Sequence, residues 1–101
     1  MNEIEPGKML MLAVRQRLPM LPADAKINLR YNPTMDNLML MVGQQDRWVA
    51  STRQDENGIV HLDSERGIVR VEIPRASAIF RADWLRHHSR SSGARKRLGL
   101  P

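Results

Sequence analysis

The segment from Asp55 to Gly58 constrains the fold of this chain more than any other stretch, because it places Asp-Glu-Asn-Gly between two candidate strands. An Asn-Gly pair tolerates the positive φ that a tight β-hairpin or a bulged turn requires. Residues 47–53 precede this turn and residues 59–63 follow it. We therefore predict a hairpin, with Trp48 and Thr52 on the same face of its first strand.

Three other segments between the two ends of the chain also have the character of strands. Residues 27–31 alternate apolar and polar side chains with a period of two, and residues 68–73 do the same. Residues 38–42 are apolar on both faces, which predicts an interior strand. Short turns separate these segments and favour antiparallel neighbours, so the predicted sheet is an antiparallel meander of about five strands.

Helical patterns flank the sheet. Residues 8–18 contain no helix breaker and carry a wide apolar stripe, and Pro19 ends the pattern. Residues 76–89 are predicted to form a second helix, with Ser77 as a candidate cap. The anchors expected to pack this helix are Ile79, Phe80 and Trp84. The predicted class is thus α+β, an open sheet with both helices on one face; a small curled barrel is the alternative.

Basic charge is concentrated in the last quarter of the chain. Residues 75–101 hold seven basic side chains and one acid, a balance of +6, whereas residues 1–74 hold nine basic and ten acidic side chains. After residue 89 the apolar periodicity stops and the sequence becomes rich in Ser, Gly and Arg. We predict a single domain over residues 1–89 and a flexible basic tail over residues 90–101.

This charge asymmetry predicts a small regulatory protein that binds nucleic acid through its C-terminal helix and tail. Clustered Arg and Lys side chains neutralise phosphates and release counterions, which gives affinity without base readout. The residues predicted to carry these contacts are Arg75, Arg81, Arg86, Arg90, Arg95, Lys96 and Arg97. A solubilising tail, or a tail that docks on an acidic protein, is the simpler interpretation of the same charges.

The alternative function is a protein-interaction module, such as an adaptor, a chaperone or a phage-encoded inhibitor of a host protein. Met39 and Met41 share one face of the predicted interior strand and by default fill the core. If both helices cover the other face, these methionines and Val49 form an exposed apolar patch. Such a patch predicts a homodimer or a protein partner that docks on the sheet face or edge.

No motif in the sequence argues for an enzyme, a cofactor or a metal site. The chain lacks a Gly-rich phosphate loop, H-E-x-x-H and G-x-S-x-G. Asp83 and His87 are four residues apart on the predicted helix, with His88 beside them, but two such groups make an incomplete zinc site. We predict that they stabilise the helix, and we assign no catalytic residue.

Composition predicts a cytoplasmic protein of bacterial or phage origin that does not enter a membrane. No apolar run reaches the ~18 residues that span a bilayer. Glu3 and Glu5 precede the first apolar run, whereas a signal peptide has a basic region there. The chain contains no Cys, which fits a reducing compartment.

Overall fold

The computed structural model describes residues 5–43 and 47–89, and it begins with helix α1 (Pro6–Arg17). Proline occupies the first helical position, where its missing N–H costs nothing. Leu10 and Val14 lie one turn apart and are fully buried, so α1 turns one apolar stripe inward. As predicted from the sequence, the helix ends just before Pro19.

Five antiparallel strands form a single sheet in the order β1-β2-β5-β4-β3. The strands are β1 (Ile27–Asn32), β2 (Asn37–Val42), β3 (Ser51–Asp55), β4 (Gly58–Leu62) and β5 (Ile68–Pro74). The predicted hairpin at Asn57-Gly58 joins β3 to β4, and Gly58 has a φ of +128°. The predicted α+β architecture of helix, five antiparallel strands and helix is confirmed.

The strand order departs from a simple meander at one junction, because β2 pairs with β5 rather than with β3. This pairing sets Leu38 opposite Ile73 and Leu40 opposite Val71, so buried apolar side chains lie side by side. Strand β3 has the sequence Ser-Thr-Arg-Gln-Asp, and all five of its residues are exposed. With no apolar side chain to bury, β3 lies at the edge of the sheet.

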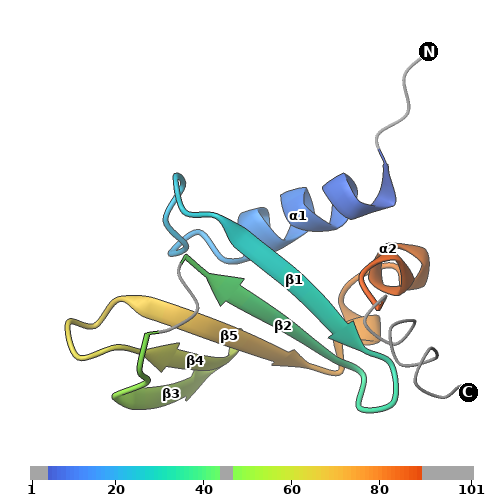
Figure 1. Ribbon diagram of the computed structural model, residues 1–101. Coiled ribbons are helices and arrows are strands. Elements are labelled where there is room, and N and C mark those ends of the chain that lie inside the picture. The colour runs from blue at the N-terminus through green and yellow to red at the C-terminus, as the bar shows by residue number, and fades with distance from the viewer. Residues whose placement is uncertain (1–4, 44–46, 90–101) are drawn as a thin grey trace, which may run out of the picture.

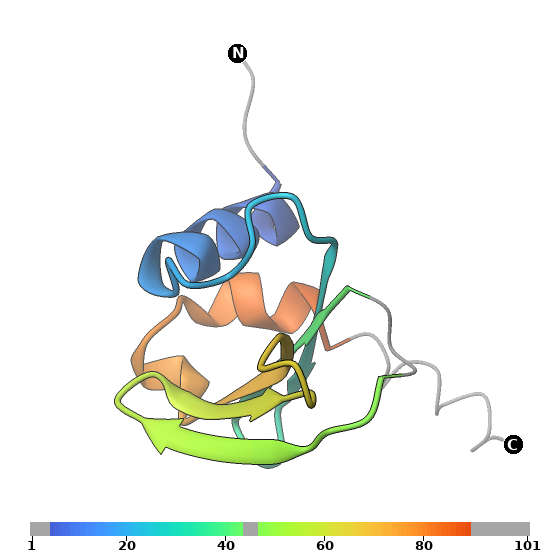
Figure 2. The same cartoon turned by 90° about the vertical axis from the view of Figure 1, so that its left-hand side faces the viewer.

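The sheet is strongly curved, and both helices lie on its concave side (Figures 1 and 2). Side chains alternate between the two faces along β2, so Leu38, Leu40 and Val42 point to the concave side, where they are buried. The core also includes Leu10, Val14, Leu18, Val60, Val71, Ile73, Phe80 and Leu85. The convex side is not covered by either helix, and Met39 and Met41 point to it and are half-buried.

The predicted C-terminal helix is interrupted. A short 3-10 turn, η1 (Ala76–Ala78), is followed by helix α2 (Ala82–His87). Ser77 is not a helix cap: its amide and its hydroxyl donate to the carboxylate of Asp36, at 3.0 and 2.6 Å. These bonds tie η1 to the β1–β2 turn.

Two expected positions of large side chains also differ. Ile79 was predicted to anchor the second helix but is 39% exposed, whereas Leu85 is fully buried and takes that role. Trp48 was predicted inside the third strand, yet β3 begins at Ser51 and Trp48 is 87% exposed. No helix in residues 5–43 and 47–89 is long and apolar enough to cross a membrane.

Candidate nucleic-acid interface

Three of the seven predicted contact residues lie in the described part of the chain: Arg75, Arg81 and Arg86. All three are exposed. The other four, Arg90, Arg95, Lys96 and Arg97, lie outside the described residues. The structure therefore shows the positions of the three predicted contact residues that precede residue 90.

Arg81 is held by its own helix and is less available than the sequence suggests. Its Nε and Nη2 atoms donate to the two oxygens of Asp83, each at 3.1 Å. The guanidinium carbon also lies 5.3 Å from the ring centroid of Trp84. Both contacts fix the side chain and offset its charge. Asp83 thus pairs with Arg81, not with His87 as the four-residue spacing predicted.

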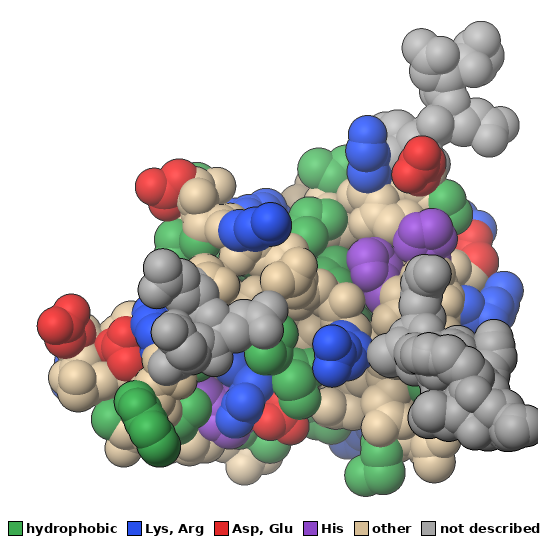
Figure 3. Space-filling view, viewed as in Figure 1, with side chains coloured by type: hydrophobic (Ala, Val, Ile, Leu, Met, Phe, Trp, Pro, Cys, Tyr) green, Lys and Arg blue, Asp and Glu red, His purple; other side chains and the backbone are tan. Residues whose placement is uncertain are grey.

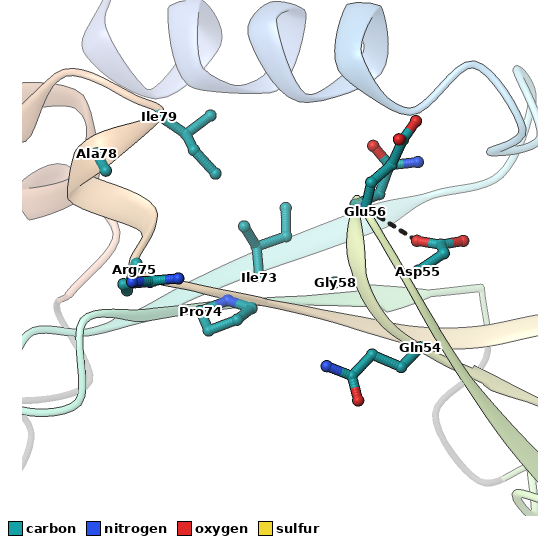
Figure 4. Close-up of a pocket in the computed structure, with 10 residues that line it drawn as sticks. Gln54, Asp55, Glu56, Gly58, Ile73, Pro74, Arg75, Ala78 and Ile79 are labelled. Carbon is teal, nitrogen blue, oxygen red and sulfur yellow. Dashed lines mark hydrogen bonds between the residues drawn. The ribbon is translucent and has the colours of Figure 1, made fainter.

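Arg75 lies on a different part of the surface. It starts η1 with a left-handed φ of +52° and lines a shallow hollow of about 370 Å³ between η1 and the β3–β4 turn. In Figure 4, Arg75 and Ile79 lie on one side of this hollow and Asp55 and Glu56 on the other. Asp55 and Glu56 thus lie across the hollow from Arg75, and two carboxylates beside one guanidinium make this part of the surface unfavourable for a polyanion.

The C-terminal end of α2 is fixed against the edge of the sheet. The carbonyl of His88 accepts a 2.9 Å hydrogen bond from the amide of Tyr31 in β1. Leu85, one turn earlier, is fully buried in the core. Arg86 lies in the last turn between these two anchors, and it is exposed without an ion-pair partner among the described residues. The last two described residues, His88 and Ser89, therefore lie beside β1.

The convex side of the sheet carries the other basic side chains near this point. Arg30 of β1 and Arg70 of β5 alternate with buried neighbours and so point away from the helices. Figure 3 shows this side, where hydrophobic, basic, acidic and His side chains are interspersed. Because β1 pairs Arg30 with Met39, this arginine lies next to the two half-buried methionines, Met39 and Met41.

A hydrogen-bonded group spans strands β5, β4 and β3 on the convex side. The Nε2 atom of His61 lies 2.9 Å from Oε2 of Glu72, and Nδ1 lies 3.2 Å from Oγ1 of Thr52. Arg70 adds a longer ion pair, with Nε 4.0 Å from the same Glu72 oxygen. Three neighbouring strands are thus linked across the sheet. Sequence reasoning missed this group because the partners are distant in the chain and only the strand order unites them.

The two adjacent histidines of α2 pack against the start of α1 rather than around a metal. Their rings meet edge to face at 5.4 Å, and His88 Nε2 lies 3.5 Å from the carbonyl of Gly7. A Cβ at Gly7 would come within 2.9 Å of the His87 ring, so this glycine permits the close approach. Among the described residues, no group of three or more His, Cys, Asp or Glu side chains is placed to hold a metal ion.

Two carboxylates that support the loops are held in their charged form. The Ser77 hydroxyl, followed by the Tyr31 hydroxyl, lowers the pKa of Asp36 through hydrogen bonds. The Tyr31 bond to Asp36 measures 2.6 Å, and together with burial it raises the pKa of Tyr31 to about 12. The backbone N–H of Gly67 is the main reason that the pKa of Asp63 is lowered. These groups shape turns and give no sign of a catalytic role.

Comparison with known proteins provides no independent functional information. No protein-family model, no curated protein and no solved structure matches the chain.

Proposed function

We propose that this chain is a small, non-enzymatic cytoplasmic regulator that binds nucleic acid through its basic C-terminal region. Arg86 and the basic side chains after residue 89 make most of the phosphate contacts. Arg75 and Arg81 contribute from the flanks. Arg81 contributes least, because Asp83 already offsets its charge.

The main support is the bond between the Tyr31 amide and the His88 carbonyl. It fixes the end of α2 on a buried, hydrogen-bonded framework, so the basic sequence starts from a defined place. Residues 90–101 contain four basic side chains and no acid. A polyanion attracted by these charges is brought to the β1 edge, where Arg86 and Arg30 are both exposed. Such binding depends on charge and releases counterions.

The test is the salt dependence of binding to a labelled single strand and to a duplex. Changing Arg90, Arg95, Lys96 and Arg97 together to Gln should weaken binding and flatten the plot of log K against log salt. For a single strand the slope should fall by up to about 3, since each neutralised phosphate contributes roughly 0.7. A matched control changes Lys8 and Arg17, exposed basic residues of α1, to Gln. If the unaltered protein binds neither probe at low salt, the proposal is wrong.

A second candidate function is a protein-interaction module, and the open edge of the sheet favours it. All five residues of β3 are exposed, and on its outer side the strand has no neighbour among the described strands. An extended segment of another protein, or of a second copy, could pair with this edge. Replacing Thr52 or Gln54 by Pro would remove a backbone donor there. Light scattering and pull-down with and without this change distinguish a dimer, a heterologous partner and a monomer.

A further inference from the structure

We propose that the hollow beside the start of β3 binds an arginine side chain of a partner protein, with the guanidinium stacked on the indole of Trp48 and paired with Glu65. The arginine belongs to an extended segment of that partner. This inference rests on the second candidate function, strand pairing at the β3 edge, and names the chemistry of the partner. It concerns a different surface from the basic C-terminal region and does not depend on nucleic-acid binding.

The hollow is shallow and has a volume of about 350 Å³. The segment before β3 and the loop after β4 line it with Arg47, Trp48, Ala50, Asp63, Ser64 and Glu65. Trp48 is the most exposed large hydrophobic side chain among the described residues, at 87%. The other aromatic rings are better covered, since Tyr31 and Phe80 are buried and Trp84 is half-buried. An indole this exposed adds little to the core, so its flat face is available to a ligand.

The charges that line the hollow favour a cation. Asp63 and Arg47 offset each other through a 3.0 Å ion pair, and both are held further by backbone groups. The carboxylate of Glu65 is exposed and has no ion-pair partner in the part of the chain that the structure describes. Arg66 follows it in the sequence but does not line the hollow. The free charge of the lining is therefore negative, which attracts a cationic group and opposes a phosphate.

Helix α2 shows the same arrangement with its arginine in place. The guanidinium carbon of Arg81 lies 5.3 Å from the ring centroid of Trp84, and two of its nitrogens donate to Asp83 at 3.1 Å. A planar guanidinium stacks on an aromatic face and donates to a carboxylate at the same time. In the hollow, Trp48 and Glu65 supply the indole and the carboxylate. An arginine from another protein completes the set.

One arginine is not enough for stable binding. At an exposed site, a cation–π contact and an ion pair together raise the affinity only about tenfold. The partner must therefore make further contacts, and β3 offers them, because it begins three residues after Trp48 and forms the edge of the sheet (Figure 1). A segment that adds to this edge gains main-chain hydrogen bonds, and the hollow then selects its arginine.

Two other occupants fit the hollow less well. Sites for small ammonium ligands enclose the cation in a cage of aromatic rings, whereas Trp48 is the one ring that lines this hollow among the described residues. A second copy of the chain could offer Arg53 from its own β3. That side chain already lies 3.7 Å from Asp55 in an ion pair. A separate protein segment with an unpaired arginine is the better match.

The experiment begins with a bead-bound library of random peptides of about ten residues, probed with labelled full-length protein at near-physiological salt. Arginine should be enriched among the bound peptides, and this enrichment should disappear when Trp48→Ala is the probe. The tightest peptide is then titrated in solution beside a counterpart that carries citrulline in place of arginine. Citrulline keeps the shape of the side chain without its charge, so the counterpart should bind about tenfold more weakly.

Trp48→Ala and Glu65→Gln should each weaken binding of the arginine peptide about threefold or more. Glu65→Gln should leave binding of the citrulline peptide unchanged. The matched controls are Met35→Ala, which removes an apolar side chain that is 69% exposed, and Glu5→Gln, which removes an exposed carboxylate before α1. Both controls should bind as the parent does. In a Trp84→Phe background, where Trp48 is the only indole, the arginine peptide should change its fluorescence.

If the arginine and citrulline peptides bind equally well, or if Trp48→Ala keeps full affinity, the inference is wrong. Loss of peptide binding in Gln54→Pro would in that case still support strand pairing at β3. If the parent protein binds no peptide of the library, both the inference and the second candidate function are wrong. A change in Trp48 fluorescence caused by oligo(dT), or by raising the protein concentration alone, would assign the hollow to a nucleic acid or to a second copy and overturn the inference.

Discussion

The amide of Tyr31 and the carbonyl of His88, 57 residues apart in the chain, are joined by a 2.9 Å hydrogen bond. The bond covers part of the β1 edge with the end of α2. The same tyrosine donates its hydroxyl to Asp36 at 2.6 Å. Tyr31 therefore links the C-terminal end of β1 both to the end of α2 and to the β1–β2 turn.

Tyr31→Phe should destabilise the protein by about 1 kcal/mol near neutral pH, because the mutation removes one hydrogen bond to a charged group. Asp36 raises the pKa of the hydroxyl to about 12 from an ordinary 10.0, so the folded state favours its protonated form. That contribution is complete below pH 10 and is lost as the pH rises toward 12. When urea unfolding is measured from neutral to alkaline pH, the free energies of unfolding of the variant and the parent should converge. If the two free energies of unfolding differ as much at high pH as at neutral pH, the Tyr31–Asp36 hydrogen bond does not stabilise the protein in this way.

Leu85→Ala should cost about 2–5 kcal/mol, because a fully buried side chain leaves a cavity where α2 meets the core. Ile79→Ala should cost less than about 1 kcal/mol, since that side chain is 39% exposed. Chemical denaturation of the two variants gives the comparison. The sequence predicted Ile79 as an anchor of the second helix, so equal losses in the two variants would support that role for Ile79.

Gly58→Ala should be strongly destabilising, by about 1–3 kcal/mol or more. The φ of +128° at this position is rare for residues with a side chain, and an added Cβ would run into the backbone carbonyl of Glu72. Gly43→Ala is the matched change, because φ is also positive there but the added Cβ would meet only the tip of Arg47 at 3.6 Å. Thermal unfolding should therefore show the larger loss at Gly58.

Arg47→Met should destabilise the end of the sheet by about 1.5–3 kcal/mol. The Arg47 guanidinium donates to the carbonyls of Val42 and Ile68 at 2.8 and 2.7 Å, and to Asp63 at 3.0 Å. Hydrogen exchange should increase in residues 62–69, which these bonds hold. Arg17→Met, a change at an exposed position of α1, should have neither effect. If both variants behave alike, the hydrogen bonds of Arg47 do not contribute to the stability of the protein.

Arg86→Gln should weaken nucleic-acid binding more than Arg81→Gln. Arg81 donates two hydrogen bonds to Asp83, so the carboxylate already offsets much of its positive charge in the parent protein. Arg86 has no ion-pair partner among the described residues, so its whole charge is available. If Asp83 screens Arg81 as proposed, the double change Arg81→Gln with Asp83→Asn should bind almost as the parent does. Titration at one fixed salt concentration measures all three variants.

Several elements were predictable because their signals are local. Pro19 ends a helix wherever it occurs, and Asn57-Gly58 suits a positive φ, so α1 and the β3–β4 hairpin follow from sequence. The interruption of the second helix was not predictable in this way. Ser77 binds Asp36, 41 residues away, and no local pattern reveals that contact.

The same distinction between local and long-range signals applies to the candidate interface. Charge is additive along a chain, so the sequence alone determined that the C-terminal quarter is basic. The alternation of apolar and polar residues likewise determined that these segments form a sheet with one apolar side. Only the tertiary structure decided that β5 inserts beside β2, that β3 becomes the exposed edge, and that Trp48 stays in solvent. Strand order and exposure depend on which distant apolar faces can be buried together, and that competition is settled by the whole fold.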